Sequence, residues 1–295
     1  MATLVVAENI NIMSKSVGAA MKERNAEPIA DLARRLDAAG ADLLDINIGP
    51  AKKDGPELME FVVHTVQEVT DLPLFLDTMN IEAIERGLSV YQPRKGKAVI
   101  NSIMARPDRM EAMLPLVEKY DCEFIALMYG PDGLPRDENE RGELAALLQA
   151  EAAMRGMDDS IIWFDPVVVP VNSQQQQLQG CTAFMEMLPM MFPDSKNTCG
   201  LSNVSNGAPP TLRALVNRVY LCMLRKFGLH SAIMDGLDET IVAIAGDRYP
   251  EMERIVHAVM DGEEPATSNE QEIQWVKTTN MLLGRSLYSD SWLEL

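Results

Sequence analysis

The stretch IADLARRLDAAGADLLDIN, residues 29–47, contains one complete structural repeat of this chain. Its first part, residues 29–39, carries apolar side chains at helical spacing, and Gly40 follows at the position where a helix commonly ends. Residues 43–47 then form a short apolar run of the kind found in a buried strand. The stretch therefore predicts a helix that leads directly into a strand.

The same alternation recurs on both sides of this stretch. Apolar runs predict further strands at residues 5–8, 74–77, 98–102, 124–128, 161–165, 231–235 and 198–201, the last running on to residues 202 and 203. Amphipathic segments predict helices at residues 58–70, 81–90, 110–119, 144–155 and 215–227. Eight such units within about 235 residues match the usual size of a (β/α)8 barrel. We expect an α/β protein with one TIM-barrel domain over residues 1–295.

Polar residues stand at or near the ends of six of these predicted strands. They are Glu8, Asp45, Asn47, Asp77, Asn101, Asp165, Ser202 and Asn203. A closed parallel barrel gathers the C-terminal ends of its strands on one face, so these side chains should converge on one pocket. Of Asp45 and Asn47 we expect only one to point inward, and we favour Asn47 because it lies closer to the strand end.

Composition and charge exclude several classes of partner. The net charge of −18 would repel nucleic acid and an anionic membrane surface. No run approaches the roughly 20 apolar residues of a membrane span, and the N-terminus shows no secretory pattern, so we expect a cytoplasmic protein. The four cysteines are scattered and the three histidines have no motif partner, which favours reduced structural thiols over a metal site or a nucleophilic triad.

Two polar runs predict surface segments. The charged run at residues 136–143 is typical of a solvated loop and helix start. The four glutamines at residues 174–177 are too few for an aggregation tract, so we expect a solvent-facing helix start or loop.

Six short motifs carry a family resemblance in their order and spacing. They are AENIN at residues 7–11, LDINIGP at 44–50, LDTMN at 76–80, INS at 100–102, FDP at 164–166 and GLSNVS at 200–205. Together they resemble the pterin-binding methyltransferases, above all the methyltetrahydrofolate:corrinoid-protein methyltransferases. These proteins also resemble the folate domain of cobalamin-dependent methionine synthase. The resemblance spans nearly the whole chain and implies a barrel of the pterin-binding, dihydropteroate synthase-like superfamily. It also implies a homodimer that binds a folate at its C-terminal face and meets a separate corrinoid protein there.

The resemblance assigns roles that suit these residue types. Asp77, Asn101 and Asp165 would bind the pterin ring, with Glu8, Asn47 and Ser202 in the same site. A carboxylate can accept two adjacent N–H groups of the pterin edge, and an amide offers both a donor and an acceptor. Asn203 would be the catalytic residue, either donating to N5 of the folate or accepting from protonated N5, depending on how its amide is turned. The alternative is that residues 202–205 form only a turn.

The expected reaction moves a methyl group between a corrinoid protein and N5 of tetrahydrofolate. We favour transfer from the methyl-corrinoid protein to tetrahydrofolate, in the demethylation of a methylated amine or ether. The alternatives are transfer from methyltetrahydrofolate to a corrinoid iron-sulfur protein in acetyl-CoA synthesis, a dihydropteroate synthase-like enzyme and a non-catalytic folate-binding protein.

Departures from known patterns narrow these alternatives. The first loop typical of dihydropteroate synthases is replaced by INIMS at residues 10–14, which argues against pteroate synthesis. A corrinoid-binding DxHxxG pattern is missing around all three histidines, so the corrinoid should arrive on a partner protein and no bound metal is expected. Many relatives carry an arginine in a short loop after the GLSNVS motif, and whether Arg213 replaces it is left open.

Overall fold

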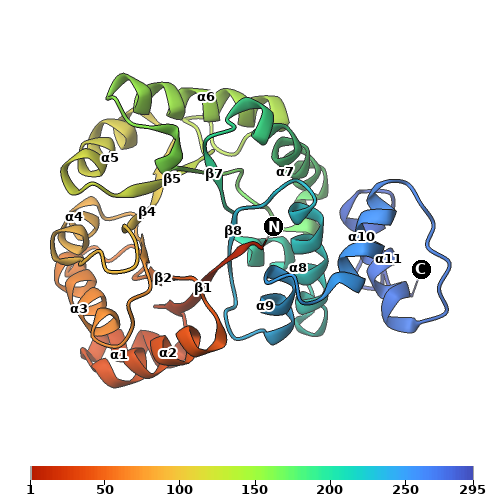
Figure 1. The fold of residues 1–295 in the computed structure, drawn as a ribbon, viewed down its shortest axis with the longest axis horizontal. Coiled ribbons are helices and arrows are strands. Elements are labelled where there is room, and N and C mark those ends of the chain that lie inside the picture. Colours follow the sequence, from red (N-terminus) through yellow and green to blue (C-terminus); the bar gives the residue numbers. More distant parts are fainter. Residues whose placement is uncertain (1, 295) are drawn as a thin grey trace.

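Eight parallel strands surrounded by helices form the body of this molecule (Figure 1). The computed structural model describes residues 2–294. Neighbouring strands are hydrogen-bonded in the order β7-β6-β5-β4-β3-β2-β1-β8, and a bridge between Gly200 and Ile233 brings the two ends of this sheet together. The predicted (β/α)8 barrel is therefore confirmed.

The strands follow the apolar runs of the sequence. They are β1 (Leu4–Asn11), β2 (Leu43–Asn47), β3 (Leu74–Asp77), β4 (Val99–Met104), β5 (Glu123–Leu127), β6 (Ile162–Asp165), β7 (Lys196–Asn197) and β8 (Ser231–Met234).

The helices of the barrel layer lie between these strands in the chain, except for α9, which follows β8. They are α1 (Lys15–Glu23), α2 (Ala26–Ala39), α3 (Gly55–Gln67), α4 (Ile81–Val90), α5 (Pro107–Tyr120), α6 (Glu138–Met154), α7 (Val171–Met191), α8 (Pro210–Arg225) and α9 (Glu239–Ala245). Two short 3₁₀ helices, η1 (Asp159–Ile161) and η2 (Leu201–Ser205), precede β6 and follow β7.

The last two helices extend the molecule to one side of the barrel. Helices α10 (Pro250–Met260) and α11 (Glu270–Leu282) pack against each other and against α8 (Figure 1). A helical pattern at residues 255–259 falls within α10, whereas no pattern was selected for α11. A single domain over residues 1–295 stays a prediction. Within residues 2–294, none of the helices combines the length and the apolar character needed to cross a membrane.

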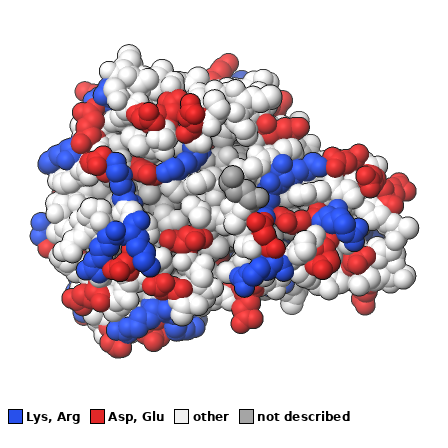
Figure 2. Space-filling view, viewed as in Figure 1, with Lys and Arg blue, Asp and Glu red and all other residues white. Residues whose placement is uncertain are grey.

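An apolar layer fills the barrel interior where the strands begin. This inner cluster consists of Val6, Leu43, Phe75, Val99, Ile125, Trp163 and Ile233. The Phe75 and Trp163 rings meet edge to face with centroids 5.4 Å apart. The Trp163 indole N–H and the Lys196 ammonium both bind the Glu123 carboxylate at this end. Figure 2 views the barrel from this end, where acidic and basic side chains are mixed. The inner cluster thus forms the floor beneath the opposite, C-terminal mouth.

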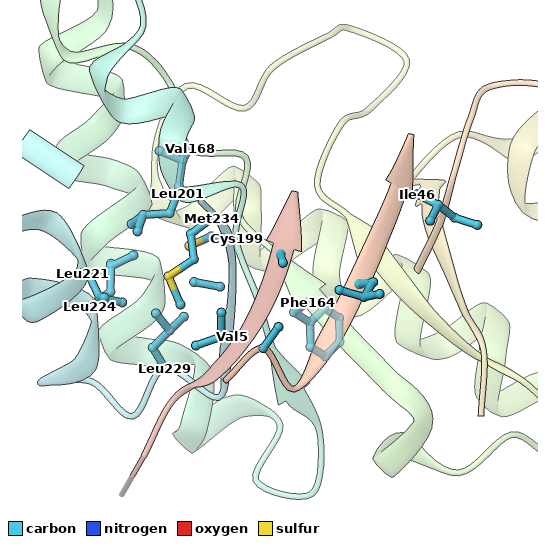
Figure 3. Close-up of a cluster of buried hydrophobic side chains, with 14 of the residues drawn as sticks. Val5, Ile46, Phe164, Val168, Cys199, Leu201, Leu221, Leu224, Leu229 and Met234 are labelled. Atoms are coloured by element: carbon cyan, nitrogen blue, oxygen red, sulfur yellow. The ribbon is translucent and has the colours of Figure 1, made fainter. Parts of the chain in front are cut away.

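A larger core joins the outer faces of the strands to the helices. Figure 3 shows part of it, where Val5, Cys199 and Met234 from the barrel wall lie near Leu221 and Leu224 of α8. All four cysteines are buried and free, so the prediction of reduced structural thiols is confirmed for the described chain. Apolar burial on both faces of a strand is what a parallel barrel requires, because helices cover the outside and side chains fill the inside.

The predicted seventh strand at residues 198–201 is wrong in its bounds. Strand β7 covers only Lys196–Asn197, and residues 201–205 form η2. The Thr198 N–H still donates to the Phe164 carbonyl and the Ile233 N–H to the Cys199 carbonyl, so the chain continues between β6 and β8 without regular pairing. Leu201 is fully buried in η2. The sequence pattern could not distinguish this turn from a strand, because it detects burial and not backbone conformation.

We expect the Phe75→Ala substitution to lower the free energy of unfolding by about 3–5 kcal/mol, because it opens a cavity in the barrel floor. Phe75→Leu fills most of that space and should cost clearly less. Chemical denaturation measures both, with Met154→Ala as the control because Met154 is 72% exposed. A loss for Phe75→Ala no larger than that for Met154→Ala would contradict the role assigned to the inner cluster.

Candidate functional site

The C-terminal ends of β2, β3 and β4 carry a network of side chains above the barrel floor. The Asn47 amide donates to the Asp77 carboxylate, and Asn101 Nδ2 donates to Asp45 Oδ1 over 2.9 Å. Asp45 is only 3% exposed. The expectation that only one of Asp45 and Asn47 points inward is wrong. The two residues are two positions apart, and alternation along a strand puts such residues on the same face.

Burial shifts the carboxylates of this network toward their protonated forms. It raises the pKa of Asp77 to about 6, against the opposing effect of the hydrogen bond from Asn47. Burial also raises the pKa of Asp45 well above its ordinary value, and the nearby Asp77 charge raises it further. Two carboxyl groups that share a dry site resist losing both protons, so this pair titrates as a unit.

Asp165 at the end of β6 forms the second acidic position. Its Oδ1 accepts a 2.7 Å hydrogen bond from the Val167 N–H, and the Gly200 N–H also donates to it. Burial nevertheless raises the pKa of Asp165 to about 6. The carboxylate is therefore fixed in position and poorly solvated.

Arg141 lies behind Asp165 and was missed by the sequence analysis. The prediction that residues 136–143 are solvated is wrong for this residue, which is fully buried. Its guanidinium donates to the backbone carbonyls of Pro166, Asp137 and Gln177, so each of its three nitrogens has an acceptor within the protein. The positive charge of Arg141 lowers the pKa of Asp165, against the larger effect of burial. Arg141 stands among other charged residues, so nothing in the sequence distinguished it as the buried one.

The glutamines at residues 174–177 lie near the start of α7 and are half-buried to exposed. The expected helix start is confirmed, although Gln174 itself has non-helical backbone angles.

The turn η2 brings a third group of polar residues to the mouth. Ser202 Oγ donates to Glu8 Oε1 over 2.5 Å, and burial raises the pKa of Glu8 despite this bond. Asn203 is exposed in the same turn and accepts a hydrogen bond from Asn206. Arg213 in the first turns of α8 donates to Ser205 Oγ over 3.1 Å. The Arg213 guanidinium thus contacts the η2 turn.

Thr198 is a further side chain that the sequence analysis did not select. It is fully buried and lies next to β6, because its N–H donates to the Phe164 carbonyl. Alternation puts it on the same face as Lys196, whose ammonium lies over the Trp163 ring of the inner cluster. Its hydroxyl has no hydrogen-bond partner within residues 2–294. Thr198 therefore adds an unused polar group to the inner wall.

All the predicted site residues lie at the C-terminal mouth, and the structure pairs several of them. Asn47 pairs with Asp77 and Ser202 with Glu8, whereas Asn101 pairs with Asp45 and Asp165 with backbone N–H groups. Buried and half-buried carboxylates and amides in one mouth suit a flat polar ligand with several N–H groups. Burial raises the pKa of Cys199 well above its ordinary value, which disfavours a thiolate nucleophile there. Within residues 2–294, no group of three metal-ligating side chains is arranged to hold an ion.

Comparisons with known proteins agree with this arrangement. A family model described as pterin binding enzyme matches residues 7–242. The chain is 27% identical over 234 residues to methylcorrinoid:tetrahydrofolate methyltransferase of Eubacterium limosum, which covers 79% of this chain and 84% of that protein. It is 27% identical over 243 residues to methionine synthase of Mycobacterium tuberculosis, covering 78% of this chain and 20% of that much longer protein.

Solved structures with the same fold include two dihydropteroate synthases. The enzyme of Xanthomonas albilineans in complex with 7,8-dihydropteroate aligns with a TM-score of 0.59 at 18% identity, over 88% of this chain and 93% of that one. The enzyme of Thermus thermophilus aligns with a TM-score of 0.61 at 18% identity, over 85% of this chain and 94% of that one. At this level of identity the likeness establishes the fold alone.

Replacing Asp77 by asparagine should change stability in a pH-dependent way. A carboxyl whose pKa is raised in the folded state, here to about 6 from 3.8, costs stability as the pH rises between these values. We expect Asp77→Asn to leave the free energy of unfolding unchanged below about pH 4 and to increase it by up to roughly 3 kcal/mol above about pH 6. Denaturation measured across this pH range tests the expectation, with the exposed Asp194→Asn as the control. An equal effect at every pH would rule out burial of the Asp77 charge as the cause.

Proposed function

This chain belongs to the pterin-binding enzyme family, and on that basis we propose that it transfers a methyl group between a corrinoid protein and N5 of tetrahydrofolate. The observation that carries the proposal is the meeting of two different groups at one barrel mouth. One is the set of buried and half-buried carboxylates and amides on β2, β3, β4 and β6, and the other is the exposed Asn203 turn. The similarity to methylcorrinoid:tetrahydrofolate methyltransferase over most of both chains supports the same reaction.

The buried carboxylates would hold the pterin ring. Asp165 already accepts backbone hydrogen bonds on one side, so its remaining lone pairs can accept adjacent N–H groups of the pterin edge. Asp77 and Asn101 would meet the other polar edge, where the amide can both donate and accept. Ligand N–H groups would replace some of the hydration that these carboxylates lose on burial, and this gain would favour binding.

The reacting atoms would lie beneath the η2 turn. In the direction toward tetrahydrofolate, the Co–C bond breaks with both electrons left on cobalt, the N5 lone pair forms the new N–C bond, and the N5 proton passes to solvent. Asn203 would provide a hydrogen bond to N5 without changing its own protonation state. Much of the rate would come from holding the two reactants in line.

The direction of transfer and the partners extend this proposal. We favour the direction named in the Eubacterium limosum relative, from the methylated corrinoid to tetrahydrofolate. We propose that this transfer belongs to the demethylation of a methylated amine or ether. The corrinoid would be carried by a separate protein that docks at the C-terminal mouth, and the enzyme would act as a homodimer. Methyl transfer between free methylcobalamin and tetrahydrofolate, followed by its visible absorption change, tests the activity. Tight folate binding without any transfer would instead support a binding protein.

Asp165→Ala should weaken tetrahydrofolate binding, because pterin N–H groups would be left unpaired in a buried site. We expect a loss of roughly 1–3 kcal/mol, or about 5- to 150-fold in affinity. Because a protonated carboxyl cannot accept both N–H groups, wild-type affinity should also fall below about pH 6, where Asp165 becomes protonated. Titration calorimetry at several pH values measures both effects, and Asp194→Ala serves as the exposed control. Unchanged affinity in a folded Asp165→Ala protein would remove this residue from the site.

Asn203→Ala should slow methyl transfer by roughly 10²-fold or more, the effect of removing one preorganised hydrogen bond from a reacting centre. Tetrahydrofolate binding should weaken much less, because the contact to N5 strengthens as charge develops in the transition state. The test combines the rate with methylcobalamin and a folate binding curve for the same protein. Equal losses in rate and affinity would make Asn203 a binding residue, and no loss in either would reduce η2 to a structural turn.

A further inference from the structure

Glu8 of β1 is a carboxylate at the mouth to which the proposed function gives no step. Its Oε1 accepts the hydrogen bond from Ser202 Oγ over 2.5 Å. Within residues 2–294 no donor is bonded to the other oxygen, Oε2, and this oxygen is not sealed from solvent. Glu8 therefore keeps one oxygen that is free to accept a hydrogen bond or a proton.

The bond from Ser202 holds Glu8 beside the turn that carries Asn203. Ser202 and Asn203 are consecutive residues of η2. The bridge from Gly200 to β8 and the pairing of β8 with β1 place η2, β8 and β1 in one sector of the barrel. Glu8 faces the inside of that sector, because it stands two residues after Val6 of the inner cluster. The carboxylate and the Asn203 turn therefore border the same part of the mouth.

This sector lies across the mouth from residues that we assign to the pterin ring. In the proposed site Asp165 of β6 meets the aminopyrimidine end of the ring, and Asp77 and Asn101 of β3 and β4 meet the edge that carries N1 and N8. N5 lies on the opposite edge of a pterin. In the closed strand order β8 stands opposite β4 and β7 stands opposite β3, so N5 would face η2, β8 and the neighbouring β1.

We propose that Glu8 is a further catalytic residue, whose free oxygen accepts the N5–H group of tetrahydrofolate and takes its proton when the methyl group is transferred. The proposal rests on the function proposed above. As the N5 lone pair forms the bond to the methyl carbon, N5 becomes positively charged while it still carries its proton. The N5–H bond then breaks, its electron pair stays on N5, and the proton forms an O–H bond on Glu8 before it leaves to solvent. The ionised carboxylate stabilises the developing positive charge, and its protonated form returns the proton to N5 in the reverse direction.

The groups around Glu8 set the pH range in which it acts as a base. Burial raises its pKa, the hydrogen bond from Ser202 lowers it, the Asp235 charge raises it and the Arg213 charge lowers it. Asp45 faces Glu8 from β2, and the Glu8 charge raises the pKa of Asp45 in turn. Only ionised Glu8 can take the proton. The rate of transfer to tetrahydrofolate should therefore rise as the pH passes through the Glu8 pKa and level off above it.

Glu8→Gln removes the base and keeps the shape of the side chain, and Ser202 can still donate to the amide oxygen. With saturating tetrahydrofolate and methylcobalamin, we expect kcat to fall by roughly 10²-fold and to lose its rise with pH. Glu8→Asp keeps a carboxylate and should recover part of the rate together with the rise. Glu251→Gln on α10 is the exposed control and should leave both unchanged. Equal losses in Glu8→Gln and Glu8→Asp with an unchanged pH profile would show a merely structural role and overturn the proposal.

The midpoint of the pH profile tests the neighbours of Glu8. Asp235→Asn removes a charge that raises the Glu8 pKa, so the midpoint should move to lower pH. Ser202→Ala removes a bond that lowers this pKa, so the midpoint should move to higher pH. The exposed Asp194→Asn should leave it in place. Loss of the rise in Asp235→Asn would give the proton to Asp235 and overturn the proposal, as would a midpoint that neither substitution moves.

The wild-type protein separates this proposal from the proposed function. Methyl transfer with the same rate and pH profile in Glu8→Gln would overturn the role of Glu8 and leave the function standing. Tetrahydrofolate binding without methyl transfer at any pH would overturn the proposed function, and the role of Glu8 with it.

Discussion

The site depends on carboxylates held above an apolar floor. Burial is the largest cause of the raised pKa values of Asp45, Asp77 and Asp165. The inner cluster keeps water from reaching them from below, and the strands prevent them from moving out to solvent. The fold therefore keeps these carboxylates poorly hydrated. A ligand with several N–H groups could replace the hydrogen bonds that they lose on burial. In the proposed site, stability and ligand binding would be opposed at these positions, as is common where a site carries buried charge.

Two kinds of support hold the two parts of the site. The carboxylates and amides of β2, β3 and β4 belong to hydrogen-bonded strands, so their positions follow from the barrel itself. Asn203 stands on an exposed turn that depends on side-chain bonds from Arg213. This division suits a reaction in which the ring must be held rigidly while one exposed amide meets a second, changing partner.

The shortness of β7 makes the exposed turn possible. A regular strand through residues 198–201 would have carried the chain past the barrel mouth, and alternation would have separated Ser202 from Asn203. The 3₁₀ turn η2 instead buries Leu201 and Val204 and leaves Asn203 exposed above Gly200. Apolar residues are buried in both conformations, so the hydrophobic pattern could not reveal the difference.

The sequence by itself determined the barrel and the mouth at which the candidate site residues meet. Apolar runs that alternate with amphipathic segments specify parallel strands and covering helices, and polar residues at strand ends must then meet at one mouth. Only the tertiary structure decided which groups pair. The bonds from Asn101 to Asp45, from Ser202 to Glu8 and from Arg213 to Asn206 join residues on separate elements. The buried Arg141 side chain likewise binds a distant part of the chain, the backbone carbonyl of Pro166. Periodicity reports which face of an element is apolar, whereas pairing and charge state depend on neighbours that the folded chain alone brings together.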